Sequence, residues 1–136
     1  MSLKHGFYRY ALAAALFALT ACSWVDSYSS SAHQQLLMLE QLHLQFITDA
    51  AVTPVDRPML RQEDSQIRQL FSLALNNSDT LRQDNLLVLK QNYQRLYAQV
   101  SSQDTALTPF AASVLTKQTE NLYQQAINGE QQRSGK

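Results

Sequence analysis

The chain has 136 residues, 45% of them hydrophobic, and its eleven basic and eleven acidic residues give a formal net charge of zero. This length suits a single domain, and the charge balance leaves no basic patch for binding nucleic acid. The one cysteine, Cys22, excludes an intramolecular disulfide.

Residues 1–21 contain the parts of an export signal in the usual order. Lys4 and Arg9 give a positive start, and residues 11–19 form an apolar run. This run is well short of the roughly 20 apolar residues that a permanent membrane-spanning helix needs. We therefore predict that residues 1–21 are a signal peptide that is removed. Without Lys4 and Arg9, nine basic residues remain against eleven acidic ones, a net charge of minus two.

The signal ends in the sequence Leu19-Thr20-Ala21-Cys22. These four residues resemble the lipobox at which bacterial lipoproteins are lipidated and then cleaved. The resemblance implies that Cys22 becomes the mature N-terminus, with a diacylglycerol on its sulfur and an amide-linked acyl chain such as palmitate. Two or three acyl chains make such an attachment effectively permanent.

The residue after the cysteine bears on where such a lipoprotein is sorted. Ser23 stands where enterobacterial lipoproteins that are retained in the inner membrane commonly carry Asp. The resemblance therefore implies an outer-membrane anchor with the folded body facing the periplasm, and inner-membrane retention is the alternative.

Residues 22–31 are predicted to form the acylated cysteine and a short Ser-rich tether. Trp24 and Tyr28 interrupt the serines. Aromatic side chains with one polar end favour the membrane interface, so these two either rest at headgroup level or pack on the folded body.

Residues 32–129 are predicted to be a helical domain, because apolar residues recur at spacings of three and four and Pro is confined to boundaries. We expect a first helix over residues 32–50, ended by Pro54 and Pro58, and a second over residues 59–76. Ser78 is expected to cap the next helix, with Asp79 in its first turn. The predicted core positions of these two helices are Leu36, Leu39, Phe46, Ile47, Ala50, Leu60, Ile67, Leu70, Phe71, Ala74 and Leu75.

A third helix is expected over residues 79–101 and a fourth from Pro109 onward. Thr108 is the predicted N-cap of the fourth helix and Gly129 its terminating residue, so residues 130–136 are expected to be a flexible tail. Short connections predict antiparallel neighbours and an all-α fold, a small four-helix bundle. The predicted inward positions are Leu86, Leu89, Tyr93, Leu96 and Val100, which form a heptad stripe, and Ala111, Val114, Leu115, Leu122 and Ala126.

Glutamine is unusually frequent, with seventeen residues, all of them after Cys22. Because they are spread through periodic segments, we interpret them as an uncharged solvent-facing surface. A Gln-lined groove for a partner is the alternative.

Recognisable catalytic constellations are missing from the sequence. Glu40 and His43 have the spacing of half a di-iron motif, but Glu63, Glu120 and Glu130 have no His at that spacing. We therefore expect no metal site and place His43 at a partly exposed position. The only other His after Cys22 is His33, and no Gly-x-Ser-x-Gly or phosphate-binding loop occurs. These absences predict a protein that is not an enzyme and needs no cofactor.

The leading functional hypothesis is a non-catalytic adaptor or assembly factor for an envelope complex of the secretin or pilus type. Helical secretin pilotins are similar in size, anchor and class, although one group of them relies on a disulfide that a single Cys cannot supply. The expected partner-facing surface consists of exposed aromatic side chains at Tyr93, Tyr97 and Tyr123, together with Leu44.

The alternative hypothesis is a periplasmic helical stress protein that acts as a chaperone or binds lipids or small ligands. The sequence Leu107-Thr108-Pro109-Phe110-Ala111 is similar to the start of the Leu-Thr-x-x-Gln motif of the Spy and CpxP chaperones. Ala111 stands where that motif has Gln, and a Thr-Pro pair is also an ordinary way to begin a helix.

Overall fold

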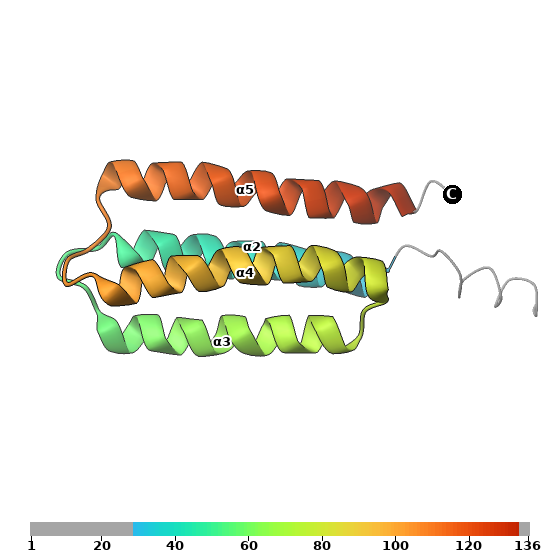
Figure 1. Ribbon diagram of the computed structural model, residues 1–136, viewed down its shortest axis with the longest axis horizontal. Helices are drawn as coiled ribbons and strands as arrows, with labels where there is room; N and C mark the ends of the chain where they lie inside the picture. The colour runs from blue at the N-terminus through green and yellow to red at the C-terminus, as the bar shows by residue number, and fades with distance from the viewer. Residues whose placement is uncertain (1–28, 134–136) are drawn as a thin grey trace, which may run out of the picture.

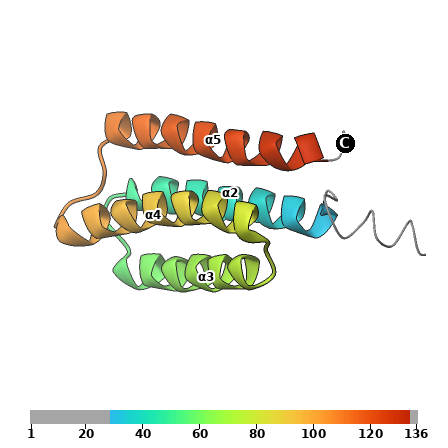
Figure 2. The same cartoon turned by 45° about the vertical axis from the view of Figure 1, so that its right-hand side comes forward.

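The computed structural model describes residues 29–133, which form an all-α four-helix bundle. The helices are α2 (Ser30–Ala50), α3 (Arg57–Asn76), α4 (Thr80–Ser102) and α5 (Pro109–Gln132). Successive helices run in opposite directions, as Figure 1 shows. Both α2 and α4 pack against α3 and α5, so α2 and α4 lie across the diagonal of the bundle (Figure 2). The predicted fold class is confirmed.

Each helix begins at a side chain that caps its first turn. The oxygens of Ser29, Asp56, Asp79 and Thr108 each accept a hydrogen bond from the backbone N–H three residues later, at 2.9–3.1 Å. Such caps satisfy one of the N–H groups that a helix start leaves without a partner. Local sequence therefore sets all four starting points.

Three of these caps correct the predicted boundaries. Asp79, and not Ser78, caps α4, because the Ser78 hydroxyl donates to the Ala74 carbonyl at 2.5 Å and is already used at the end of α3. Ser29 starts α2 two residues early, so Ser30 and Ser31 belong to the helix and not to the tether.

The start of α3 also differs from the predicted residue 59, because Asp56 caps this helix. The helix includes Arg57 and Pro58, and proline is tolerated in a first turn, where its missing N–H needs no partner.

The predicted end of the last helix is wrong. Gly129 does not adopt a positive φ, and α5 continues to Gln132. Two ion pairs hold this last turn, from Glu130 to Arg82 and from Arg133 to Asp79. Residues 130–132, predicted to be a tail, are therefore helical.

Aliphatic and aromatic side chains from all four helices fill the core. Most predicted core residues are buried, whereas Leu70, Leu75, Ala111, Leu115 and Leu122 are only partly buried and Val114 is exposed. The predicted inward face of α5 was therefore wrong in part. A different stripe of this helix packs against α2. That stripe is Thr119, Tyr123, Ala126, Ile127 and Glu130.

The glutamines confirm the interpretation as a solvent-facing surface. None of the seventeen is buried, and only Gln35 and Gln83 are half-buried. An amide-rich surface thus surrounds the apolar core on all four helices.

Candidate functional site

A polar and aromatic cluster lies at the centre of the core. His43 of α2 is 1% exposed, and its Nδ1 lies 3.1 Å from the hydroxyl oxygen of Tyr123 on α5. Its ring also makes edge-to-face contacts with Tyr93 of α4 and with Tyr123, with ring centroids 5.3 Å and 5.6 Å away. The expectation that His43 is partly exposed is therefore wrong, because the two tyrosine rings enclose it.

Hydrogen bonds link this cluster to α3 and to the protein surface. The Tyr93 hydroxyl donates to Asp64 Oδ1 at 2.6 Å, and both carboxylate oxygens of Asp64 accept from Arg68 Nε at 2.9 Å. The Arg68 guanidinium in turn lies 5.3 Å from the ring centroid of Tyr97. One connected set of side chains thus ties α4 to α3, while His43 and Tyr123 tie α2 to α5.

Burial keeps the centre of the cluster uncharged near neutral pH. It lowers the pKa of His43 to about 4 and raises the pKa values of both Tyr93 and Tyr123 above the usual 10.0. Among residues 29–133, His43 Nε2 finds no hydrogen-bond partner. A neutral imidazole closed off from solvent cannot exchange protons with a substrate. The cluster is therefore suited to fixing the register of the four helices.

Glu40 and His43, the half di-iron motif, both lie on α2. Burial raises the pKa of Glu40, and the nearby charge of Glu120 on α5 raises it further. Between residues 29 and 133, no group of three or more His, Cys, Asp and Glu side chains could hold a metal ion.

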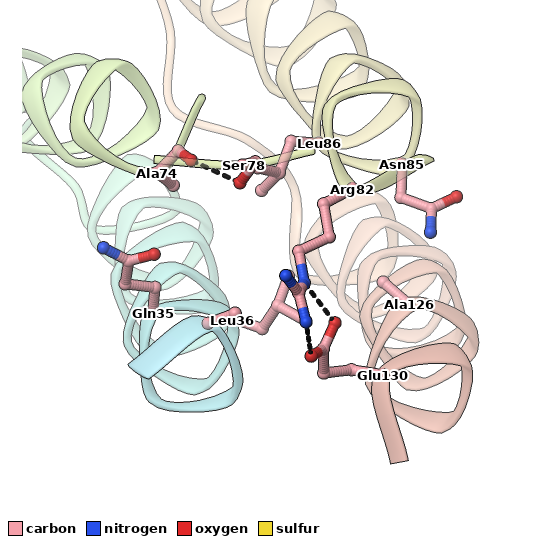
Figure 3. A pocket seen from close by; sticks show the side chains of 10 residues that line it. Gln35, Leu36, Ala74, Ser78, Arg82, Asn85, Leu86, Ala126 and Glu130 are labelled. Atoms are coloured by element: carbon pink, nitrogen blue, oxygen red, sulfur yellow. Dashed lines mark hydrogen bonds and ion pairs between the residues drawn. The ribbon is translucent and has the colours of Figure 1, made fainter. Parts of the chain in front are cut away.

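The end of the bundle where α2 begins, which we call the tether end, is held by a buried ion pair. Figure 3 shows Arg82 of α4 and Glu130 of α5 pointing toward one another, with Nε–Oε2 and Nη2–Oε1 distances of 2.8 Å and 2.5 Å. Glu130 Oε1 also accepts the backbone N–H of Ser29 at 3.0 Å. Burial opposes ionisation of Glu130, but the hydrogen bonds from Arg82 and Ser29 outweigh it and lower its pKa.

A cavity of about 20 Å³ lies beside this ion pair, with Leu36, Leu86 and Ala126 in its lining (Figure 3). That volume is enough for about one water molecule. It cannot hold an acyl chain or an aromatic side chain.

The opposite end of the bundle, which we call the distal end, contains the α2–α3 and α4–α5 connections (Figure 1). The Leu107 N–H donates to the Ala50 carbonyl at 2.9 Å, and the Arg57 guanidinium donates to the Val100 and Gln103 carbonyls. These bonds fix the start of α5, where Phe110 is 80% exposed. An aromatic side chain at that exposure makes little contact with its own domain.

The structure buries two of the predicted partner-facing residues and leaves the others partly exposed. Tyr93 and Tyr123 are fully buried, and Tyr97 and Leu44 are half-buried and pack against the core. The two buried tyrosines are excluded as contact points because their hydroxyls and rings are used within the central cluster. Phe110, which periodicity did not single out, is the most exposed large hydrophobic side chain among residues 29–133.

The predicted lipidation and sorting residues, Cys22 and Ser23, lie outside the described residues, as do Trp24 and Tyr28. Within residues 29–133, no helix combines the length and apolar character needed to cross a membrane. No protein-family model, curated protein or solved structure matches the chain.

Proposed function

We propose that this chain is an outer-membrane lipoprotein, anchored through Cys22, whose bundle is a non-catalytic protein-binding adaptor or assembly factor for a periplasmic envelope complex. The lipobox Leu19-Thr20-Ala21-Cys22 supports the anchor. Acylation would consume the only thiol of the chain. A secretin or pilus assembly is the kind of complex proposed, on the analogy of small anchored helical proteins.

The observation that best supports a protein-binding role is the exposed Phe110 at the distal end. Val114, one turn later on α5, is also exposed, and so is Val52 in the α2–α3 connection at the same end. Aromatic side chains are frequent among the residues that contribute most to protein–protein binding. An anchor at one end and an exposed aromatic residue at the other suit a protein that reaches from a membrane to a partner.

The packed interior gives the alternative hypothesis less support. The cavity beside the Arg82–Glu130 pair has room for only about one water molecule, and the central polar cluster is closed by tyrosine rings. A lipid or small ligand would have to separate helices to enter. Binding at the distal end needs no such opening.

The anchor is tested with Cys22→Ala. We expect this variant to lose the acyl mass found on the wild-type chain by mass spectrometry. It should also leave the outer-membrane fraction or remain uncleaved in the inner membrane. If the variant still fractionates with the outer membrane, protein contacts carry the attachment and the proposed anchor role is wrong.

The adaptor role is tested by crosslinking the anchored protein in cell envelopes and identifying what co-purifies. We expect one dominant envelope protein with the wild-type chain and its loss with Phe110→Ser. Val88→Ser is the matched control, because Val88 is also exposed but lies in the middle of α4. Many unrelated clients, no partner, or equal effects of the two variants would contradict the proposal.

A further inference from the structure

Two exposed leucines flank the connection between α3 and α4 at the tether end. Leu73, in the last turn of α3, is 57% exposed, and Leu81, in the first turn of α4, is 60% exposed. Leu81 shares a surface pocket with Glu130 of α5 and with Arg133, which directly follows that helix. Since Glu130 also bonds the Ser29 N–H, Leu81 lies beside the point where the chain enters the bundle.

Four charged side chains near Leu81 form ion pairs, whereas Asp84, one turn further along α4, is exposed. Arg82 pairs with Glu130, and Arg133 pairs with Asp79 at 2.8 Å. Two positive and two negative side chains therefore neutralise one another at this end. The connection itself contains only uncharged side chains before Asp79, namely Asn77 and Ser78. Paired charges lose less hydration energy than unpaired ones when they approach an apolar boundary, and exposed leucines favour that approach.

The length of the chain before Ser29 limits how far this end can lie from the membrane. Six residues separate Ser29 from Cys22, so even a fully extended tether of seven Cα–Cα steps spans about 25 Å. Each helix of the bundle is itself about 30–36 Å long at 1.5 Å per residue. The tether end is therefore the part of the bundle that the anchor holds next to the lipid.

We infer that the tether end is a membrane-contact surface, with Leu73 and Leu81 resting at the boundary between lipid headgroups and acyl chains. This inference rests on the proposed acylation of Cys22. It assigns the two ends of the bundle to different partners, the tether end to lipid and the distal end to protein.

The test uses the full chain, acylated in cells, purified and reconstituted into phosphatidylethanolamine–phosphatidylglycerol vesicles. Because acylation occupies Cys22, an introduced cysteine is the only free thiol. Leu81→Cys carries an environment-sensitive fluorophore, and Phe110→Cys with the same fluorophore is the matched control at the distal end. Both positions are highly exposed, so neither label displaces core packing.

We expect brominated lipids to quench the label at position 81 by about half, as for a group about 5–10 Å into the interface, and to leave the label at 110 unchanged. Equal quenching at the two positions, or none at 81, would overturn the inference. A spectral shift at 81 without quenching by brominated lipids would place the label against protein, which also overturns it. Mass spectrometry of each sample separates the two proposals. An acylated but unquenched chain refutes the membrane contact alone, and an unacylated chain refutes the anchor.

Discussion

The ion pair between Arg82 and Glu130 leads to a specific prediction about stability. The Arg82 side chain is 15% exposed to solvent and the Glu130 side chain is 4% exposed. Removing one partner of a buried ion pair typically costs about 3–5 kcal/mol, because the other charge is left unpaired. Arg82 keeps some access to water and lies 3.6 Å from Asp79, so we expect Glu130→Leu to cost about 2–4 kcal/mol.

Urea denaturation at neutral pH measures this cost for Glu130→Leu, Arg82→Leu and the double variant. We expect the double variant to cost less than the sum of the single variants, with a coupling energy of about 1–3 kcal/mol. For a domain of this size, each kcal/mol corresponds to a shift of about 4–8 °C in melting temperature.

The same pair predicts the direction in which the free energy of unfolding changes with pH. The pKa of Glu130 is lowered from 4.5 in the folded state. The stabilisation by the pair is therefore complete above about pH 4.5 and is lost as the pH falls through the folded-state value. The double variant should lose less stability in acid than the wild-type chain does. Additive single variants, or a cost of Glu130→Leu below about 0.5 kcal/mol, would refute the assigned pairing.

Three further predictions concern stability, each measured by urea denaturation. Tyr93→Phe should cost about 1.5–3 kcal/mol, because it removes the 2.6 Å hydrogen bond to charged Asp64; a cost near zero would contradict that bond. Burial, a hydrogen bond to Asp49 and its charge raise the pKa of Glu63 from 4.5 to about 8, so wild-type stability should fall as the pH rises from about 4.5 to 8. Glu63→Gln should flatten that fall, and an unchanged pH profile would contradict the shift. Gly129→Ala should stabilise by about 0.5–1 kcal/mol, because Gly129 is helical and an added Cβ meets nothing within 4 Å; destabilisation would mean that α5 ends there.

The sequence predicts the helices well because their signals are local. Thr108 and Pro109 mark the start of α5, and the caps of the other helices lie within three residues of the groups they satisfy. The stripe from Leu86 to Val100 has spacings of three, four, three and four, and all five of its members are buried. Heptad spacing of this kind follows from the geometry of one helix face and needs no knowledge of its neighbours.

The central cluster depends on partners that are far apart in the chain. His43 has the same helical spacing as the buried residues Leu36, Leu39, Phe46 and Ala50, and this spacing predicts burial. We nevertheless expected this polar side chain to be partly exposed. Its hydrogen-bond partner Tyr123 is 80 residues away. A buried polar side chain is stable only when such a partner exists, and periodicity cannot supply its identity.

The end of α5 was mispredicted for the same reason. Glu130 is buried because Arg82, 48 residues earlier, neutralises it. Taken alone, a Gly followed by Glu and Gln is typical of a helix end. The exposure of the predicted partner-facing tyrosines was also wrong for Tyr93 and Tyr123, since aromatic type alone does not separate these buried residues from Phe110, which is exposed.

Photocrosslinking in bacterial cells tests most directly whether the distal end, and not the tether end, contacts the protein partner. A photoreactive amino acid is placed at position 110 or at position 81 of the full-length chain. We expect one dominant protein adduct from position 110 and no adduct with that protein from position 81. The same protein adduct from both positions, or none from position 110, would contradict this expectation.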